Sequence, residues 1–235
     1  MTTVTGTPRL VLWDIDQTLI DGGTATHSAY AAAFHQATGA QLVQPWQFDG
    51  RTELAAAGEV LRVHGFDPAG EVLRIFLDLI IIELQQRAPQ LAATGKVLSG
   101  AAEALAAAGR TPGMHQSVLT GNLYPLAVLK LTTFSLDTHL DLRIGAYGGD
   151  AVERADLPQH ALDRARHHLG QSFLGTQMVI IGDTRRDIQA AHAIGAKAIG
   201  VATGTTSAAE LHATGADVVL PDLTDTQAVL HAITT

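Results

Sequence analysis

The stretch RLVLWDIDQT, residues 9–18, places a short apolar run directly before two aspartates. A continuous apolar run of this length is typical of a strand that is buried on both faces of a sheet. Similar runs lie at 117–119, 178–181, 198–201 and 217–220, with a weaker candidate at 142–146. Ala- and Leu-rich segments with helical spacing lie between them, at 99–109, 123–134, 158–169 and 186–194. Strands that alternate with helices predict an α/β fold, in which helices cover both faces of a parallel sheet.

The segment from 21 to 93 breaks this alternation. It contains helical patterns at 28–38, 52–63 and 69–86, and no convincing strand pattern. We therefore expect a core domain made of residues 1–20 and 94–235. Residues 21–93 are expected to form a small helical domain that is inserted after the first strand.

The composition excludes several classes of protein. The formal net charge is −8 and there are only three lysines, so the chain lacks the basic patch that nucleic-acid binding requires. It also has no basic amphipathic stretch and no apolar run long enough for a membrane. The absence of cysteine rules out disulfides, thiolate catalysis and cysteine-ligated zinc. The first residues show no signal-peptide pattern, so we expect a cytoplasmic protein.

The first candidate site residues are Asp14 and Asp16. In an open parallel sheet, ligands bind beyond the carboxyl ends of the strands, and Asp14 directly follows the first apolar run. Two carboxylates at such a place can divide the chemistry, because one can attack while the other moves a proton. Either aspartate equally suits an ordinary helix cap.

The second candidate is the sequence SVLTGN, residues 117–122. The hydroxyl of Thr120 and the free N–H groups around Gly121 and Asn122, at the start of the next helix, can hold a phosphate oxygen. An ordinary Thr or Asn helix cap gives the same pattern.

The third candidate is GDTRRD, residues 182–187, which follows the apolar run at 178–181. Asp183 ends the strand, and Asp187 lies one helical turn further on, so both can face one site. Sites lined by carboxylate oxygens suit Mg²⁺. The alternative is a capped helix with a surface Asp–Arg pair.

Taken in order, these motifs resemble those of the haloacid dehalogenase superfamily of phosphatases. The family's Asp-x-Asp-x-Thr motif is found at 14–18, its Thr at the end of a strand matches Thr120, and its Gly-Asp-x-x-x-Asp motif is found at 182–187. The resemblance covers residues 9–20 and about 95–222. Gln17 stands where the family often has Gly.

The family's third motif, a Lys or Arg near the start of the helix before the last of these strands, has no obvious match. Arg154 is our candidate, because it lies just ahead of the helix predicted at 158–169. Lys130 is the rival, but it lies ten residues beyond Thr120, about 15 Å of rise along a regular helix. A surface position for Arg154 is the remaining alternative.

The resemblance implies a Mg²⁺-dependent phosphatase. Asp14 would attack phosphorus to form an aspartyl-phosphate, and Asp16 would protonate the leaving oxygen and then activate water. Mg²⁺ would be held by the Asp14 carboxylate, the Asp16 carbonyl and Asp183, with support from Asp187.

The phosphoryl oxygens would be bound by Thr120 with Gly121 and Asn122, and by Arg154 or Lys130. The insertion at 21–93 corresponds in position to the family's helical cap, which carries much of the substrate choice. In the stretch FDGRT, residues 48–52, Arg51 can face the site, although Thr52 equally reads as a helix cap. The layout looks most like that of phosphoglycolate phosphatases, with a small phosphate ester as the substrate.

Several alternatives remain. A β-phosphoglucomutase-like mutase shares the core motifs, and a catalytically silent binding protein could keep the fold. A Schiff-base branch of the family uses a cap lysine, and no lysine occurs before Lys96. A dinucleotide-dependent oxidoreductase would have a glycine-rich turn where Asp14 and Asp16 stand.

Overall fold

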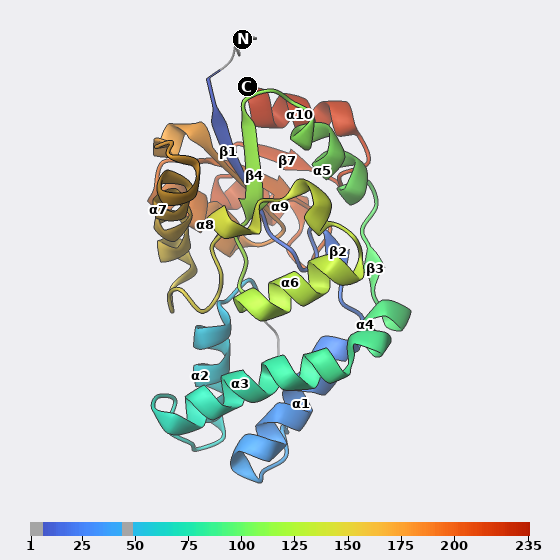
Figure 1. Ribbon diagram of the computed structural model, residues 1–235, viewed down its shortest axis with the longest axis vertical. Helices are drawn as coiled ribbons and strands as arrows, with labels where there is room; N and C mark the ends of the chain where they lie inside the picture. Colours follow the sequence, from blue (N-terminus) through green and yellow to red (C-terminus); the bar gives the residue numbers. More distant parts are fainter. Residues whose placement is uncertain (1–6, 44–48) are drawn as a thin grey trace.

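The protein is described here by a computed structural model, which covers residues 7–43 and 49–235. Two layers are visible along its longest axis (Figure 1): a core that contains the sheet and the C-terminus, and a group of helices at the opposite end. Strand carboxyl ends of the core point toward that second group.

The core contains one five-stranded parallel sheet in the order β4-β1-β5-β6-β7. Its strands are β1 (Arg9–Trp13), β4 (Met114–Val118), β5 (Met178–Gly182), β6 (Lys197–Val201) and β7 (Val218–Leu220). Trp13 is in register with Val118 on one side and with Ile181 on the other. The residues that follow these three strands therefore meet at one edge of the sheet, as the sequence predicts.

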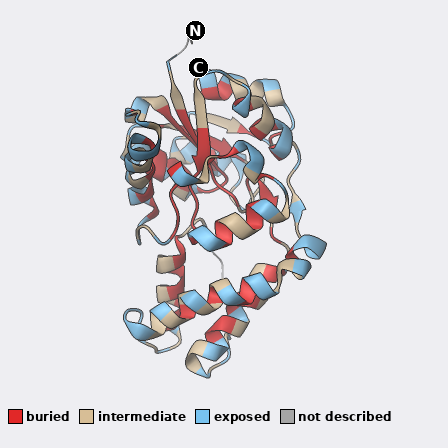
Figure 2. Ribbon diagram, in the orientation of Figure 1, coloured by how far each residue is buried: buried red, intermediate tan, exposed pale blue. Residues whose placement is uncertain are grey.

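Helices cover both faces of this sheet. They are α5 (Ala101–Gly109), α6 (Tyr124–Thr133), α7 (Leu157–Leu169), α8 (Arg185–Ala193), α9 (Ala208–Thr214) and α10 (Thr226–Thr234). Val11 and Trp13 pack in one core cluster with residues of α5, α6 and α10, and Leu10 and Leu12 pack in another with residues of α7, α8 and α9. Because successive strand residues point to opposite faces, β1 is buried on both (Figure 2).

The inserted segment forms a separate helical layer. It contains α1 (Ala25–Thr38), α2 (Glu53–Val63), α3 (Glu71–Gln86) and α4 (Ala88–Thr94), between the short antiparallel strands β2 (Ile20–Asp21) and β3 (Lys96–Val97). Its apolar cluster also includes Leu126 of α6, and in it the rings of Tyr30 and Phe34 each make a T-shaped contact with the ring of Phe76. We call helices α1–α4 and the loops between them the cap, and keep its boundaries at 21 and 93 as a proposal.

The segment 142–146 is not a strand, contrary to the weaker sequence prediction. Leu142–Ile144 forms a 3₁₀ helix, η2, because the Asp141 carboxylate accepts a hydrogen bond from the Arg143 amide at 3.1 Å and closes a turn. Ala146 alone makes an isolated bridge to Leu119. The three other 3₁₀ helices in the described chain are η1 (Asp137–His139), η3 (Arg154–Asp156) and η4 (Gly175–Gln177). In the described part of the chain, no helix combines the length and apolarity that crossing a membrane requires.

Candidate active site

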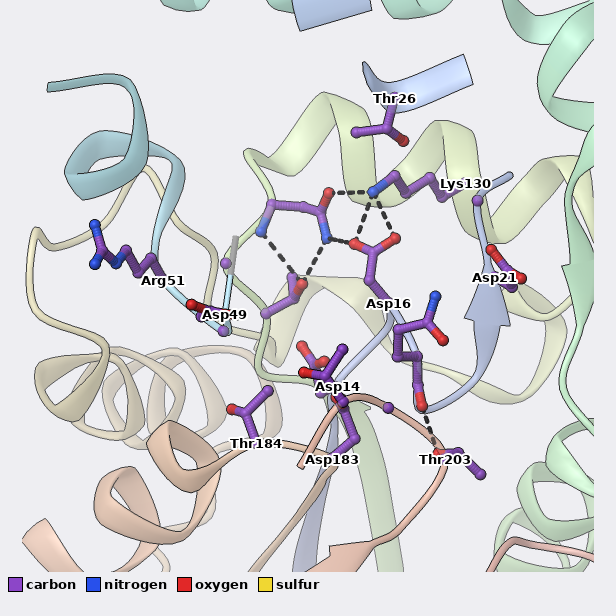
Figure 3. Close-up of a pocket in the computed structure, with 18 of the residues that line it drawn as sticks. Asp14, Asp16, Asp21, Thr26, Asp49, Arg51, Lys130, Asp183, Thr184 and Thr203 are labelled. Carbon is purple, nitrogen blue, oxygen red and sulfur yellow. Dashed lines mark hydrogen bonds and ion pairs between the residues drawn. The ribbon is translucent and has the colours of Figure 1, made fainter. Parts of the chain in front are cut away.

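A cavity of about 450 Å³ lies where the strand ends of the core face the cap. Asp14, Thr120 and Asp183 line it from the ends of β1, β4 and β5. Residues of the cap, including Gly50 and Glu53, close it from the other side. The three strand ends that the sequence singled out are thus brought together at one cavity (Figure 3).

Asp14 contacts the buried guanidinium group of Arg154 at the cavity. Nη2 of Arg154 donates to Oδ1 of Asp14 at 2.7 Å and to Oδ1 of Asp187 at 2.6 Å. The Arg154 side chain is 3% exposed, so these pairs are shielded from water. Arg154 is therefore not a surface arginine, because it lies within hydrogen-bond distance of the expected nucleophile.

Three buried carboxylates form a cluster that suits a metal ion. One oxygen each of Asp14, Asp183 and Asp187 lies within 4.8 Å of the others. Burial raises the pKa of Asp14 to about 7, although Arg154 opposes the shift. Burial, with the charges of Asp14 and Asp187, also raises the pKa of Asp183 to about 8. A divalent cation would reverse these shifts because it favours the ionised forms, so the donor set fits Mg²⁺.

The aspartate two residues on, Asp16, faces a different part of the cavity. Nζ of Lys130 donates to both of its carboxylate oxygens, at 2.8 and 2.7 Å, and to Oδ1 of Asn122 at 2.7 Å. Nδ2 of Asn122 in turn donates to Asp16 at 2.7 Å and to Oγ1 of Thr120 at 2.8 Å. Lys130 and Asn122 thus hold the Asp16 side chain outside the metal cluster (Figure 3).

The backbone at Gln17 has a conformation that favours glycine. Its φ angle is +61°, in the left-handed region, where a residue without Cβ is favoured. The turn is held by a hydrogen bond from the Gln17 amide to the Ile20 carbonyl at 2.7 Å. The Gln17 carbonyl also accepts from Oγ1 of Thr203 at 2.5 Å.

A loop of the cap is joined to the core beside the cavity. The Glu53 amide donates to the Gly121 carbonyl at 2.8 Å, and Oγ1 of Thr52 donates to the Val152 carbonyl at 2.6 Å. Nη1 of Arg154 donates to the Gly50 carbonyl at 3.0 Å. A Cβ at Gly121 would lie 2.0 Å from the Arg51 carbonyl oxygen, so the backbones can approach only because this position is glycine.

Arg51 lines the cavity, but its guanidinium lies away from Asp16 and Lys130 (Figure 3). It is close enough to Glu59 of α2 to help lower the pKa of that carboxyl, although the hydrogen bonds from Arg62 lower this pKa most. The role of Arg51 toward the substrate stays a prediction. Phe48, at the start of the quoted stretch, lies outside the described residues.

Sequence reasoning missed several residues of the cavity. Thr184 donates to Oδ2 of Asp187 through its amide at 3.0 Å and through its hydroxyl at 2.7 Å. Its capping-box spacing to Asp187 is a signal that the sequence contained. Gly204 packs against Asp183, and Glu53 lies in the first turn of α2. Neither of these two residues had a local signal, because only the tertiary fold brings them to the site.

Comparisons with known proteins agree with this geometry. Residues 156–226 match the family model described as HAD-hydrolase-like. No curated protein matches the sequence. This family match includes Asp183 and Asp187, the two carboxylates that follow β5.

Solved structures resemble the chain over nearly its full length. A predicted phosphatase from Clostridium acetobutylicum is 20% identical, with a TM-score of 0.72 over 96% of this chain and 100% of the other. A hydrolase from Pseudomonas syringae is 20% identical, with a TM-score of 0.70 over 97% of this chain and 100% of the other. CbbY from Rhodobacter sphaeroides, in complex with phosphate, is 19% identical, with a TM-score of 0.71 over 95% and 99%. Together with the match over residues 156–226, this likeness confirms that the chain has the fold of the haloacid dehalogenase superfamily.

Proposed function

We propose that the protein hydrolyses a small phosphate monoester, with Asp14 as the nucleophile and Mg²⁺ as the cofactor. The observation that carries this proposal is the environment of Asp14. The residue directly follows β1, which pairs with a strand on each side. It lines the cavity, contacts Arg154 at 2.7 Å and lies in a cluster with Asp183 and Asp187. A nucleophile, a fixed cation and a metal site are the parts that phosphoryl transfer requires.

In this proposal Asp14 uses one carboxylate oxygen to attack phosphorus, and the bond from phosphorus to the leaving oxygen breaks. Asp16 gives a proton to that oxygen, and the alcohol departs. Asp16 then takes a proton from a water molecule whose oxygen attacks phosphorus, and the bond to Asp14 breaks to release phosphate. Lys130 and Asn122 support this role because they fix the direction of the Asp16 carboxylate.

Asp14, Asp183 and Asp187, with the backbone carbonyl of Asp16, would hold Mg²⁺. The ion would draw charge from the phosphoryl oxygens and let a phosphate dianion approach several carboxylates. Arg154 contributes a fixed positive charge from the chain itself, and Thr120 and Gly121 line the same cavity. The direct test is phosphate release from a panel of phosphate monoesters in the presence of Mg²⁺. Transfer of the phosphoryl group between two positions of one sugar, without net release, would favour the mutase alternative.

We expect activity to require Mg²⁺ and Asp183 to mediate that requirement. EDTA should stop phosphate release, and added Mg²⁺ should restore it. Replacing Asp183 by alanine removes a ligand, so the Mg²⁺ concentration for half-maximal activity should rise about tenfold or more. The matched control is Asp163→Ala, because Asp163 is exposed on α7 and accepts a hydrogen bond from the nearby Gln159. An Asp183→Ala protein with wild-type metal dependence would contradict the ligand assignment.

Gly204 offers a second test of the same metal site. A Cβ at this position would lie 1.8 Å from Oδ2 of Asp183, so Gly204→Ala must displace that carboxylate. We expect a rise of about tenfold in the Mg²⁺ concentration for half-maximal activity, measured by titrating the ion in the phosphate-release assay. Gly149→Ala is the control, since Gly149 is exposed and the nearest atom is a Leu123 methyl at 3.2 Å. Equal Mg²⁺ curves for the two variants would show that Asp183 does not bind the ion.

A further inference from the structure

Glu53 is a buried acid on the cap side of the cavity. It lies in the first turn of α2 and lines the cavity, and the residue is only 3% exposed. Its Oε2 atom has no hydrogen-bond partner within residues 7–43 and 49–235. A buried polar atom without a partner is costly, so such an atom at the wall of a cavity calls for an explanation.

The backbone around Glu53 is fixed, so a local shift of the cap cannot bring its carboxyl to a hydrogen-bond donor. The preceding Thr52 is fixed by its hydroxyl to the Val152 carbonyl at 2.6 Å, and it caps α2 by accepting from the Ala55 amide at 3.2 Å. The amide of Glu53 itself donates to the Gly121 carbonyl at 2.8 Å. The backbone on which this carboxyl stands is therefore held against the core.

The nearest cation cannot satisfy Glu53 either. Lys130 lies close enough to oppose the effect of burial, which raises the pKa of Glu53 to about 8. An ammonium group has three N–H donors, and Lys130 directs its three contacts to Oδ1 and Oδ2 of Asp16 and to Oδ1 of Asn122. All three N–H donors of Lys130 are therefore engaged, and Oε2 of Glu53 has no hydrogen-bond donor within the described residues.

The cavity is larger than a phosphate group requires. Its volume of about 450 Å³ falls in the range of pockets that hold small organic ligands. In the proposed reaction the phosphoryl group lies against Asp14 and Arg154 in the core. The organic part of the ester then extends toward the cap, where Glu53 stands.

We propose that Glu53 is a specificity residue which accepts a hydrogen bond from the leaving group of the substrate. This rests on the proposed phosphatase function. The ester would carry a hydroxyl or an amino group on its organic part, as the phosphates of polyols and amino alcohols do. Once Glu53 is ionised, above its pKa of about 8, a carboxylate or a second phosphate at that place would be disfavoured by like charge. Phosphoglycolate, which the resemblance suggests, is therefore a poor substrate above that pH.

The test uses phosphate esters with one carbon skeleton and different end groups. The series consists of ethyl phosphate, 2-hydroxyethyl phosphate, 2-aminoethyl phosphate and phosphoglycolate, with the corresponding three-carbon esters alongside. We expect kcat/KM for the hydroxyl or the amino ester to exceed that for the methyl-ended ester about tenfold or more, since a site built to accept a hydrogen bond rejects ligands that lack the donor. Above about pH 8, where Glu53 is ionised, phosphoglycolate should be the poorest substrate of the four.

The variant Glu53→Gln keeps the size of the side chain but cannot ionise, and it is compared with the wild-type protein at the same pH above about 8. The ratio of kcat/KM for the preferred ester to that for phosphoglycolate should fall at least about tenfold, a readout that does not depend on how much of the sample is folded. If Glu53→Gln lowers kcat/KM for the amino ester alone, the preferred leaving group carries an ammonium group. If it lowers kcat/KM for the hydroxyl ester, by a smaller factor, the preferred leaving group is a polyol. The control Glu59→Gln changes a half-buried acid of the same helix that pairs with Arg62 and does not line the cavity. It should leave the ratio unchanged.

Two results would overturn the inference while leaving the proposed function intact. One is a wild-type protein that hydrolyses p-nitrophenyl phosphate but prefers phosphoglycolate or shows no preference among the esters. The other is an unchanged ratio in Glu53→Gln. If none of the esters, p-nitrophenyl phosphate included, is hydrolysed with Mg²⁺ present, the proposed function is overturned and the inference falls with it.

Discussion

Replacing Asp14 by asparagine is expected to abolish turnover and leave the fold intact. The amide has nearly the same shape, and its oxygen can still accept the hydrogen bond that Arg154 now gives to Oδ1 of Asp14. It cannot attack phosphorus as a carboxylate does. We expect kcat to fall at least about 10⁴-fold, which corresponds to about 5.4 kcal/mol of barrier.

The measurement is phosphate release under saturating substrate, together with thermal unfolding of the metal-free protein. Removing one of three clustered carboxylates reduces their mutual repulsion, so the unfolding temperature should not fall. Asp78→Asn is the matched control, because Asp78 is exposed on α3 and pairs only weakly with Arg74 at 3.5 Å. A folded Asp14→Asn protein that retained more than about a tenth of wild-type activity, a loss below about 1.4 kcal/mol, would show that another group attacks.

The second large effect is expected at Arg154. Its Nη2 contacts Asp14 and Asp187, so it places a fixed positive charge where the transferring phosphoryl group would lie. Arg154→Ala should lower kcat/KM about 10²-fold or more, roughly 2.7 kcal/mol of transition-state stabilisation. Lys130→Ala should cost clearly less, because Lys130 acts through Asp16 and Asn122 and does not contact Asp14 in this structure.

Arg154→Ala also leaves two buried carboxylates without their partner, which destabilises a protein. The thermal unfolding of the variant must therefore be measured together with its kinetics. If the activity falls because the positive charge is missing, guanidinium ion added at low concentration should partly restore turnover. Arg143→Ala provides the control, since Arg143 is exposed and pairs with Asp141. A larger kinetic defect in Lys130→Ala than in Arg154→Ala would transfer the role of the cation to Lys130.

The parallel sheet and the three strand ends could be predicted because each strand carries its own signal. A run such as 10–13 is apolar throughout, which is typical of a strand that is buried on both faces. The polar residue after each run then marks the edge where ligands bind. The helices α4 and α9 were not predicted, because seven residues give too little periodicity to separate a helix from a loop. The nine-residue helix α10 was missed as well.

Lys130 shows where distance along the chain misleads. Its ten-residue separation from Thr120 argued against a place in the site, since it corresponds to about 15 Å along a helix. In the structure α6 lies across the strand ends, between the core and the cap (Figure 1), and the long side chain reaches Asp16 at 2.7 Å. How a helix is laid over a sheet depends on packing between distant segments, which no local pattern of residues records.

The short strands β2 and β3 have a consequence for how this protein can evolve. The chain leaves the core at Ile20–Asp21 and returns at Lys96–Val97, and these two pairs of residues lie side by side. With respect to the sheet, the cap is therefore equivalent to one long loop. Its length and sequence can change without shifting the strands that precede Asp14 and Asp183. Substitutions in the cap could replace the residues around the leaving group, Glu53 included. The core would then catalyse the same reaction on a different compound.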